Sequence, residues 1–167
     1  MFEHLYIHIP FCDGKCHYCG FYSVMAAPSL TGLYAGLPTA ELSMLRETRQ
    51  IVGRSPIRTV YMGGGTPAML GCDGLRRLAD SIADKLDLSG VTEWTVELNP
   101  ASVNAGLLRA LRAIGANRVS IGVQIFDDPS LQRIGRRHTA EDAARAVAIA
   151  QDAGFGNVGI DLIAGLP

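Results

Sequence analysis

The sequence predicts an α/β domain whose parallel strands form an incomplete barrel. Short strand-like runs alternate with longer helical patterns, which is typical of βα units. Polar residues gather at the carboxyl ends of these runs, where barrel enzymes place their chemistry. The 167 residues are too few for a complete barrel of eight strands, which needs about 250 residues. An open doubly wound sheet is the alternative, because it uses the same right-handed crossovers.

Five segments have the composition and length of strands. Residues 5–9 form the first, which Pro10 stops, and residues 58–62 form the second, which leads directly into three glycines. The others are expected at residues 93–97, 118–123 and 158–163. About five parallel strands are therefore predicted, within a single core domain that spans residues 1–167. Because the sequence stops just after the fifth strand, we expect this domain to be the N-terminal part of a longer protein, with its C-terminal domain absent.

Helical patterns fill the segments between these strands. Gly36 and Pro38 argue against a helix that starts upstream of Pro38, so the helix before the second strand is expected at about residues 42–52. The helix after the second strand should bury a stripe of apolar residues spaced three and four apart, namely Leu75, Leu78, Ile82 and Leu86.

Capping residues mark the ends of two further helices. Ser102 is expected to cap a helix that continues to about residue 114. Thr139 and Asp142 lie three residues apart and resemble a capping box, which predicts a helix from there to near Gly154.

Composition and charge exclude several classes of protein. Hydrophobic residues make up 48% of the chain, which excludes intrinsic disorder. With 15 Lys+Arg against 16 Asp+Glu, the chain lacks the excess of positive charge that is typical of nucleic-acid-binding proteins. No apolar run approaches the roughly 20 residues that span a bilayer. The first residues lack a charged and apolar leader, so we expect a cytoplasmic protein in a reducing compartment.

Three cysteines lie close together just beyond the first strand. Cys12, Cys16 and Cys19 have the spacing C-x3-C-x2-C, and a loop of this kind can place three thiolates around one small inorganic centre. Iron–sulfur cubanes usually take four cysteines. Three ligands therefore leave one iron open to an exogenous molecule, which makes the missing fourth cysteine the informative feature.

The same three cysteines are also compatible with a zinc site or a disulfide. A structural zinc ion needs four protein ligands, and His8 or His17 could supply the fourth. A disulfide with one free thiol is disfavoured in a reducing compartment. The remaining cysteine, Cys72, is expected to be a small buried apolar residue rather than a ligand.

The whole chain resembles a known family. The cysteine spacing resembles the cluster motif of radical S-adenosylmethionine (radical SAM) enzymes. The wider match is to the oxygen-independent coproporphyrinogen III oxidase group, and within it to the HemW-like branch of heme chaperones. It is carried by six motifs in order along the chain, YIHIPFC with CHYCGF, YMGGGTP, VELNP, RVSIGVQIF, IGRRH and DLIAGLP. The fold that this resemblance implies is a partial TIM barrel of the radical-SAM (β/α)6 type.

The resemblance implies two cofactors. Cys12, Cys16 and Cys19 would hold a 4Fe–4S cluster, whose open iron binds the amino and carboxylate groups of S-adenosylmethionine (SAM). In such enzymes the reduced cluster cleaves SAM to methionine and a 5′-deoxyadenosyl radical. A reductant such as flavodoxin or ferredoxin is expected by analogy.

Eight further residues match positions that surround SAM in this family. The glycine-rich loop would meet the methionyl end of SAM through its backbone, and the other side chains would lie around the cofactor. The eight are Tyr6, Gly64, Gly65, Thr66, Glu97, Gln124, Arg136 and Asp161.

Most of these residues also suit a purely structural role. Tyr6 suits a core aromatic residue, and the three glycines suit a tight turn. Asp161 could form a buried salt bridge with Arg136, while Glu97 and Gln124 could cap neighbouring loops.

One departure from the oxidase pattern bears on the activity. The oxidase proper, as the family is known, carries an extra cysteine two residues after the third, and here that position is Phe21. We therefore expect a chaperone that binds heme and delivers it to recipient hemoproteins. The alternatives are an enzyme acting on a porphyrin or related aromatic substrate, and a zinc-stabilised domain without redox chemistry.

Overall fold

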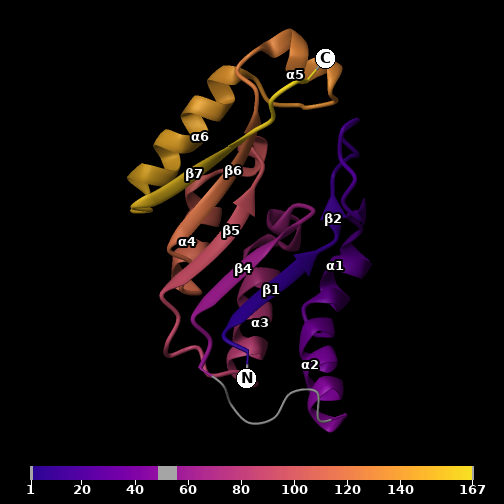
Figure 1. The fold of residues 1–167 in the computed structure, drawn as a ribbon, viewed down its shortest axis with the longest axis vertical. Helices are drawn as coiled ribbons and strands as arrows, with labels where there is room; N and C mark the ends of the chain where they lie inside the picture. Colours follow the sequence, from indigo (N-terminus) through magenta and orange to yellow (C-terminus); the bar gives the residue numbers. More distant parts are fainter. Residues whose placement is uncertain (1, 49–55, 167) are drawn as a thin grey trace.

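The fold is built on one parallel sheet of five strands. A computed structural model of the chain describes residues 2–48 and 56–166. The strands lie in the order β1-β4-β5-β6-β7, so each crossover moves one place in the same direction (Figure 1). A doubly wound sheet would reverse direction at a switch point. The predicted incomplete barrel is therefore confirmed, with β1 at His4–Ile9, β4 at Thr59–Gly64, β5 at Glu93–Leu98, β6 at Arg118–Gln124 and β7 at Asn157–Leu162.

The helices pack against one face of this sheet and along its β1 edge. Helices α3 (Gly71–Ala83), α4 (Ala105–Ala113) and α6 (Ala140–Asp152) lie behind the strands in Figure 1. The other helices of the described residues are α1 (Pro28–Tyr34), α2 (Leu37–Glu47), α5 (Asp128–Arg133) and the short 3₁₀ helices η1 (Pro67–Leu70) and η2 (Pro100–Ser102). Within the described residues, no helix is long and apolar enough to cross a membrane.

The hydrophobic core lies between the sheet and these helices. Met62, Val96 and Ile121 point from three neighbouring strands into this layer and are fully buried. The predicted stripe of α3 meets them from the helical side, since Leu75, Leu78, Ile82 and Leu86 are all buried. Leu86 lies just beyond the end of α3.

The start of α4 differs from the sequence prediction, and the start of α6 agrees with it. Asn104, not Ser102, caps α4, and its side-chain oxygen accepts from the amide of Leu107 at 2.9 Å. The Ser102 hydroxyl instead donates to the Asn99 carbonyl within η2 at 2.7 Å. The predicted capping box is confirmed, because Thr139 and Asp142 exchange both hydrogen bonds at the start of α6.

Helix α2 begins earlier than predicted. It starts at Leu37, so the expectation that no helix would begin before Pro38 was wrong. Pro38 lies in the first turn, where its missing N–H would have had no helical partner. The predicted helix end at residues 49–52 lies outside the described residues. Helix α1 was not predicted, and it buries none of its residues, which explains why its apolar pattern is weak.

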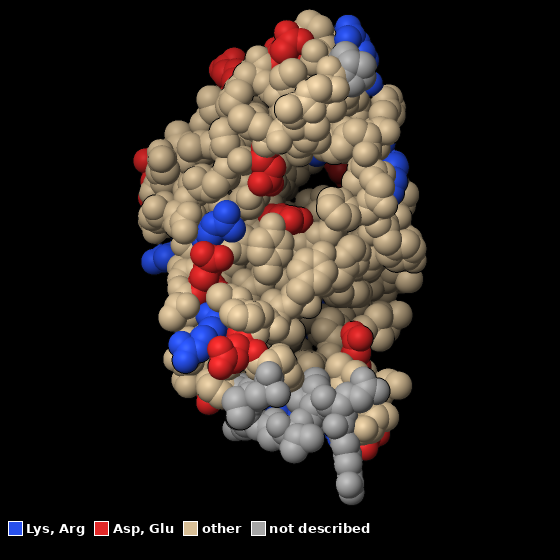
Figure 2. Space-filling view, viewed as in Figure 1, with Lys and Arg blue, Asp and Glu red and all other residues tan. Residues whose placement is uncertain are grey.

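The opposite face of the sheet is polar and open. Tyr6, Tyr61 and Glu97 lie on this face, while their sequence neighbours point into the core. The side chain of Tyr6 is 56% exposed. Figure 2 looks onto this face and shows a hollow in it, with acidic side chains around the opening.

Candidate metal centre

A cavity of about 350 Å³ opens at the carboxyl ends of the strands. Its walls come from the cysteine loop, the glycine-rich loop after β4 and the ends of β5, β6 and β7. Ten of the eleven residues predicted for the site line it, which are Cys12, Cys16, Cys19, Gly64, Gly65, Thr66, Glu97, Gln124, Arg136 and Asp161. Segments far apart in the sequence therefore meet in one place, as the family resemblance implies.

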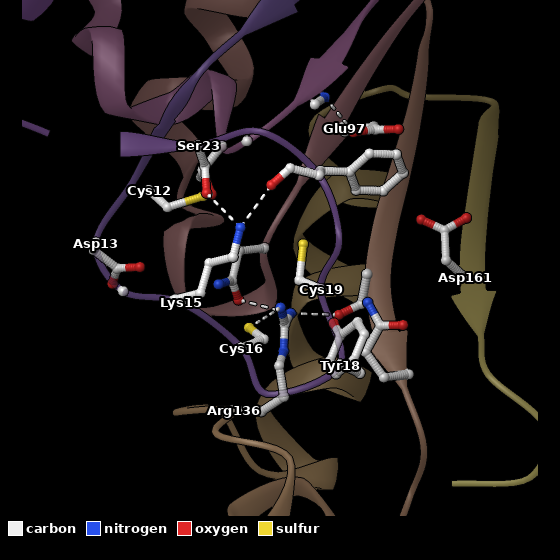
Figure 3. A pocket seen from close by; sticks show the side chains of 18 of the residues that line it. Cys12, Asp13, Lys15, Cys16, Tyr18, Cys19, Ser23, Glu97, Arg136 and Asp161 are labelled. Carbon is white, nitrogen blue, oxygen red and sulfur yellow. Dashed lines mark hydrogen bonds between the residues drawn. The ribbon is translucent and has the colours of Figure 1, made fainter. Parts of the chain in front are cut away.

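The cysteine loop is closed at its base by a small parallel ladder. Strand β2 (Phe11–Cys12) pairs with β3 (Val24–Met25), which joins the two ends of the loop. The Val24 amide donates to the Pro10 carbonyl at 2.7 Å, and the Ala26 amide donates to the Cys12 carbonyl at 3.0 Å. The loop between these bonds therefore projects from a fixed base toward the cavity (Figure 3).

Two of the three thiol groups receive hydrogen bonds from residues that line the cavity. The Thr66 hydroxyl donates to Cys12 Sγ at 3.8 Å, and Arg136 Nη1 donates to Cys16 Sγ at 3.7 Å. The Cys19 amide donates to the Cys16 carbonyl at 3.1 Å, which forms a tight turn between these two cysteines. All three thiols are free and partly exposed, so they are available to a centre in the cavity.

The loop itself is held by side chains whose roles the sequence did not reveal. Lys15 Nζ crosses the loop and donates to the Phe21 carbonyl at 2.6 Å. On the outer side, the His17 amide donates to the Ile134 carbonyl at 3.0 Å, and His17 Nδ1 lies 2.9 Å from the Arg133 carbonyl. The contacts of His17 join residues more than a hundred positions apart, so no local sequence pattern could predict them. Only the position of Lys15 between two cysteines was a usable signal.

The geometry also bears on zinc as the alternative centre. Among the described residues, no group of three or more His, Cys, Asp or Glu side chains is placed to hold a single metal ion. A cubane differs from such a site, because each thiolate binds a different iron and the sulfurs stand further apart. His17 Nδ1 and both nitrogens of His8 are engaged by other groups. The expectation that Cys72 is buried was wrong, because its side chain is exposed at the start of α3.

The glycine-rich loop packs tightly against other parts of the protein. A Cβ at position 63 would overlap the Glu97 carboxylate, and one at position 64 would overlap the His8 ring. At position 65 it would lie 2.6 Å from the Phe11 carbonyl oxygen. Glycine is thus required here by neighbouring protein atoms, whereas the sequence suggested close approach of a ligand. The Gly65 amide donates to the Ile9 carbonyl at 2.7 Å and holds the loop beside the first cysteine.

Glu97 holds the glycine-rich loop in place from the end of β5. It accepts from the Tyr61 hydroxyl at 2.6 Å and from the Gly64 amide at 3.0 Å. Burial and this bond to the carboxylate raise the pKa of Tyr61, so the phenol stays protonated and continues to donate. The Glu97 side chain therefore links the wall of the sheet to the loop above it.

Arg136 reaches the cavity from the loop between α5 and α6. Its Nη2 donates to the Gly122 carbonyl at 2.6 Å and to Asn99 Oδ1 at 3.2 Å. Burial raises the pKa of Tyr18, which also lines the cavity, to about 12, although the nearby Arg136 guanidinium acts in the opposite direction. In the sequence Asn99 appeared only within the motif VELNP, and its role in anchoring an arginine was missed.

Asp161 and Gln124 stand on the far wall of the cavity. Asp161 points toward the cavity from β7 (Figure 3) and accepts from the Ser120 hydroxyl at 2.9 Å. Within residues 2–48 and 56–166 no ion pair joins it to Arg136, so the buried salt bridge considered above is not formed. Gln124 has a φ of 70°, which no other described non-glycine residue matches in sign. Backbone strain of this kind clusters at functional sites.

Tyr6 is the one predicted site residue that does not line this cavity. It lines a second cavity of about 340 Å³ between β1 and α2, together with His8 and Tyr34. The Tyr6 hydroxyl lies 3.0 Å from His8 Nδ1. His8 Nε2 lies 3.0 Å from the Tyr22 carbonyl, which can only accept. This assigns the proton to Nε2, so that the Tyr6 hydroxyl donates to Nδ1. His8 thereby joins β1 to the end of the cysteine loop.

Comparisons with known proteins agree with this geometry. Residues 6–167 match the radical SAM superfamily. The heme chaperone HemW of Lactococcus lactis is 40% identical over 163 residues, which cover 97% of this chain and 41% of the relative. HemW of Bacillus subtilis is 39% identical over 165 residues, covering 97% and 42%. The oxygen-independent coproporphyrinogen III oxidase of Bradyrhizobium diazoefficiens is 33% identical over 165 residues, covering 98% and 36%.

A solved structure shares the same fold. The coproporphyrinogen III oxidase HemN of Escherichia coli, described as a radical SAM enzyme, superposes with a TM-score of 0.81 at 30% identity, covering 98% of this chain and 37% of that one. The chain thus spans about two fifths of the length of the relatives it matches. From the match over nearly its entire length, the chain belongs to the radical SAM superfamily, a family that implies a 4Fe–4S cluster and SAM as cofactors.

Proposed function

We propose that residues 1–167 are one core domain that holds a 4Fe–4S cluster through Cys12, Cys16 and Cys19. The observation that carries this proposal is a set of three free thiols on one anchored loop, all facing a single cavity. The donor set fits a cubane, since iron–sulfur clusters are held by cysteine thiolates. Three ligands from the protein leave one iron for SAM.

The other cavity residues suit the binding of SAM. The cluster, when bound and reduced, supplies the electron that cleaves SAM. The chain positions the cofactor through the backbone of Gly64, Gly65 and Thr66, which the bonds to Ile9, Phe11 and Glu97 hold rigid. The carboxylate of Asp161 on the opposite wall is a suitable acceptor for the hydroxyl groups of a ribose.

We further propose that the domain serves a cytoplasmic heme chaperone of the HemW type, which binds heme and passes it to recipient hemoproteins. Phe21 supports this role, because it stands two residues after the third cysteine, where the oxidase proper has a further cysteine. The identity to two HemW proteins, 40% and 39%, also exceeds the 33% to an oxidase. A flavodoxin or ferredoxin would supply the electrons.

An enzyme acting on a porphyrin is the second candidate. The observation that favours it is the close superposition on HemN, with a TM-score of 0.81. Both candidates share the cluster and the tetrapyrrole as a partner, and they differ in whether the tetrapyrrole is changed.

Two measurements separate the possibilities. Iron and sulfide analysis of protein purified without oxygen should give about four of each per chain, whereas one zinc per chain would refute the cluster. A heme titration should then show saturable binding, and coproporphyrinogen should not be converted to its tripropionate product. Conversion with SAM and a reductant present would favour the enzyme over the chaperone.

A further inference from the structure

Arg136 holds an unusual position among the charged residues around the cysteine loop. Its guanidinium lies beside the second cysteine, with Nη1 3.7 Å from Cys16 Sγ. Figure 3 shows it between this cysteine and the carboxyl ends of the strands. Lys15, the other cation that lines the cavity, directs its ammonium group to the Phe21 carbonyl instead.

Neutral groups, and no carboxylate, fix the guanidinium in this position. Nη2 donates to the Gly122 carbonyl at 2.6 Å and to the amide oxygen of Asn99 at 3.2 Å. Asn99 is itself oriented by the Ala101 amide, which donates to the same oxygen at 3.3 Å. Because both anchors are uncharged, the positive charge of Arg136 is not cancelled by them.

The next residue in the chain has the opposite arrangement. Arg137 Nη1 forms an ion pair with Asp13 at 3.3 Å, and its side chain is 67% exposed. No ion pair to Arg136 is found within the described parts of the chain. Two adjacent arginines thus differ in the feature that matters here, because one is paired at the surface and the other directs an uncancelled charge at a thiol.

A cation and an N–H donor at a ligand sulfur have a defined effect on an iron–sulfur cluster. Reduction adds one negative charge to the cluster, and a nearby positive charge stabilises the reduced form more than the oxidised form. Hydrogen bonds to the sulfurs act in the same direction, and both raise the reduction potential.

We propose that Arg136 is a positioning residue that tunes the cluster, donating to the Cys16 thiolate and making the cluster easier to reduce. This inference rests on the proposed cluster at Cys12, Cys16 and Cys19. It gives Arg136 a role toward the sulfur of a protein ligand, in addition to any contact with SAM. The guanidinium is suited to this task because its planar group reaches two fixed acceptors and the sulfur at once.

The test is the midpoint potential of the reconstituted cluster, followed by visible absorbance and by the electron paramagnetic resonance of the reduced form. Without SAM, Arg136→Met should lower the midpoint relative to the unaltered protein. Arg136→Lys keeps the charge without the planar fork and should recover part of the shift. Arg137→Met removes the same formal charge from an exposed position next door, where water screens it, and should lower the midpoint by less than Arg136→Met does.

The outcomes separate the role of Arg136 from the presence of the cluster. An equal midpoint in Arg136→Met and the unaltered protein, at equal iron and sulfide content, would overturn the inference. If Arg136→Met takes up no cluster, Arg136→Gln decides in the same way, because it also removes the charge. Failure of the unaltered protein to assemble any cluster would contradict the proposed function itself.

Discussion

The two faces of the same sheet differ sharply in what they contribute. On the helical face, Met62, Val96 and Ile121 are completely buried and form the centre of the core. On the open face, Glu97 and Ser120 are hydrogen bonded within a polar layer that leads to the cavity. Because side chains alternate along a strand, neighbouring residues belong to different faces. The face with the helices forms the core, and the open face leads to the candidate site.

The cysteine loop gives the largest expected difference between the two faces, because a change there should affect the cluster and leave the stability of the fold nearly unchanged. Cys16→Ala should abolish assembly of the cluster, because the loop offers no other thiol in its place. Thermal unfolding of the cluster-free protein should change little, since Cys16 is only partly buried. Cys72→Ala, on the exposed start of α3, is the control and should assemble a full cluster. A normal cluster in Cys16→Ala, by iron and sulfide analysis, would remove the metal centre from this loop.

Adjacent residues of β6 measure the difference between the faces directly. Ile121→Ala should lower the free energy of unfolding by about 2–5 kcal/mol, because it opens a cavity in the core. Ser120→Ala should cost about 1 kcal/mol, since the exposed Asp161 that it releases can bind water instead. Denaturant unfolding of both variants gives the two values. Equal losses would show that the open face also supports the fold.

Two glycines at the carboxyl end of β4 sharpen the comparison between the faces. A methyl group at position 65 meets backbone carbonyl oxygens, and one at position 63 meets a side chain that can move. Gly65→Ala should therefore destabilise the protein by about 1–3 kcal/mol, and Gly63→Ala by less. Glu97→Ala loses the bonds from Tyr61 and Gly64 and should itself destabilise the protein, so Gly63→Ala should cost less when it is added to Glu97→Ala than when it is added to the unaltered protein. An equal cost in both backgrounds, by denaturant unfolding, would contradict the contact with Glu97.

The smallest expected effect concerns acid. Burial and then the nearby Arg136 guanidinium lower the pKa of His138, whose Nε2 bonds to the Val123 carbonyl. The unfolded chain should take up this proton near pH 6.5, before the folded protein does. The contribution of neutral His138 to the free energy of unfolding is therefore complete above about pH 6.5. It is lost as the pH falls from there toward the lowered pKa of the folded protein. His138→Gln should flatten the fall in unfolding free energy between about pH 6.5 and 5, and an unchanged slope would exclude His138 as its source.

The strands and several helix ends were predictable because their signals are local. Strand limits agree to within one residue or two with the alternation of the sequence, as in β5 and β6. The capping box at Thr139 is also a local pattern. The start of α4 was placed wrongly because two capping residues, Ser102 and Asn104, stand close together, and only the backbone path distinguishes them.

The residues of the candidate site were predictable, but the hydrogen bonds that hold them in place were not. The cysteines and the cavity residues follow from the spacing and the family resemblance, apart from Tyr6, which lines another cavity. The contacts of Lys15, Asn99 and His8 could not be predicted. The contacts of Asn99 and His8 depend on which segments meet after folding. Lys15 bonds within its own loop, so its position between two cysteines is the one local signal.

The backbone at Gln124 has a consequence for protein engineering. A side chain at a φ of 70° is tolerated poorly, so a glycine at this position would make the fold easier to form. A search for thermostable variants would therefore select Gln124→Gly early. Such a variant would gain heat resistance while losing an amide from the wall of the cavity, which makes residue 124 one to keep out of any stabilising library.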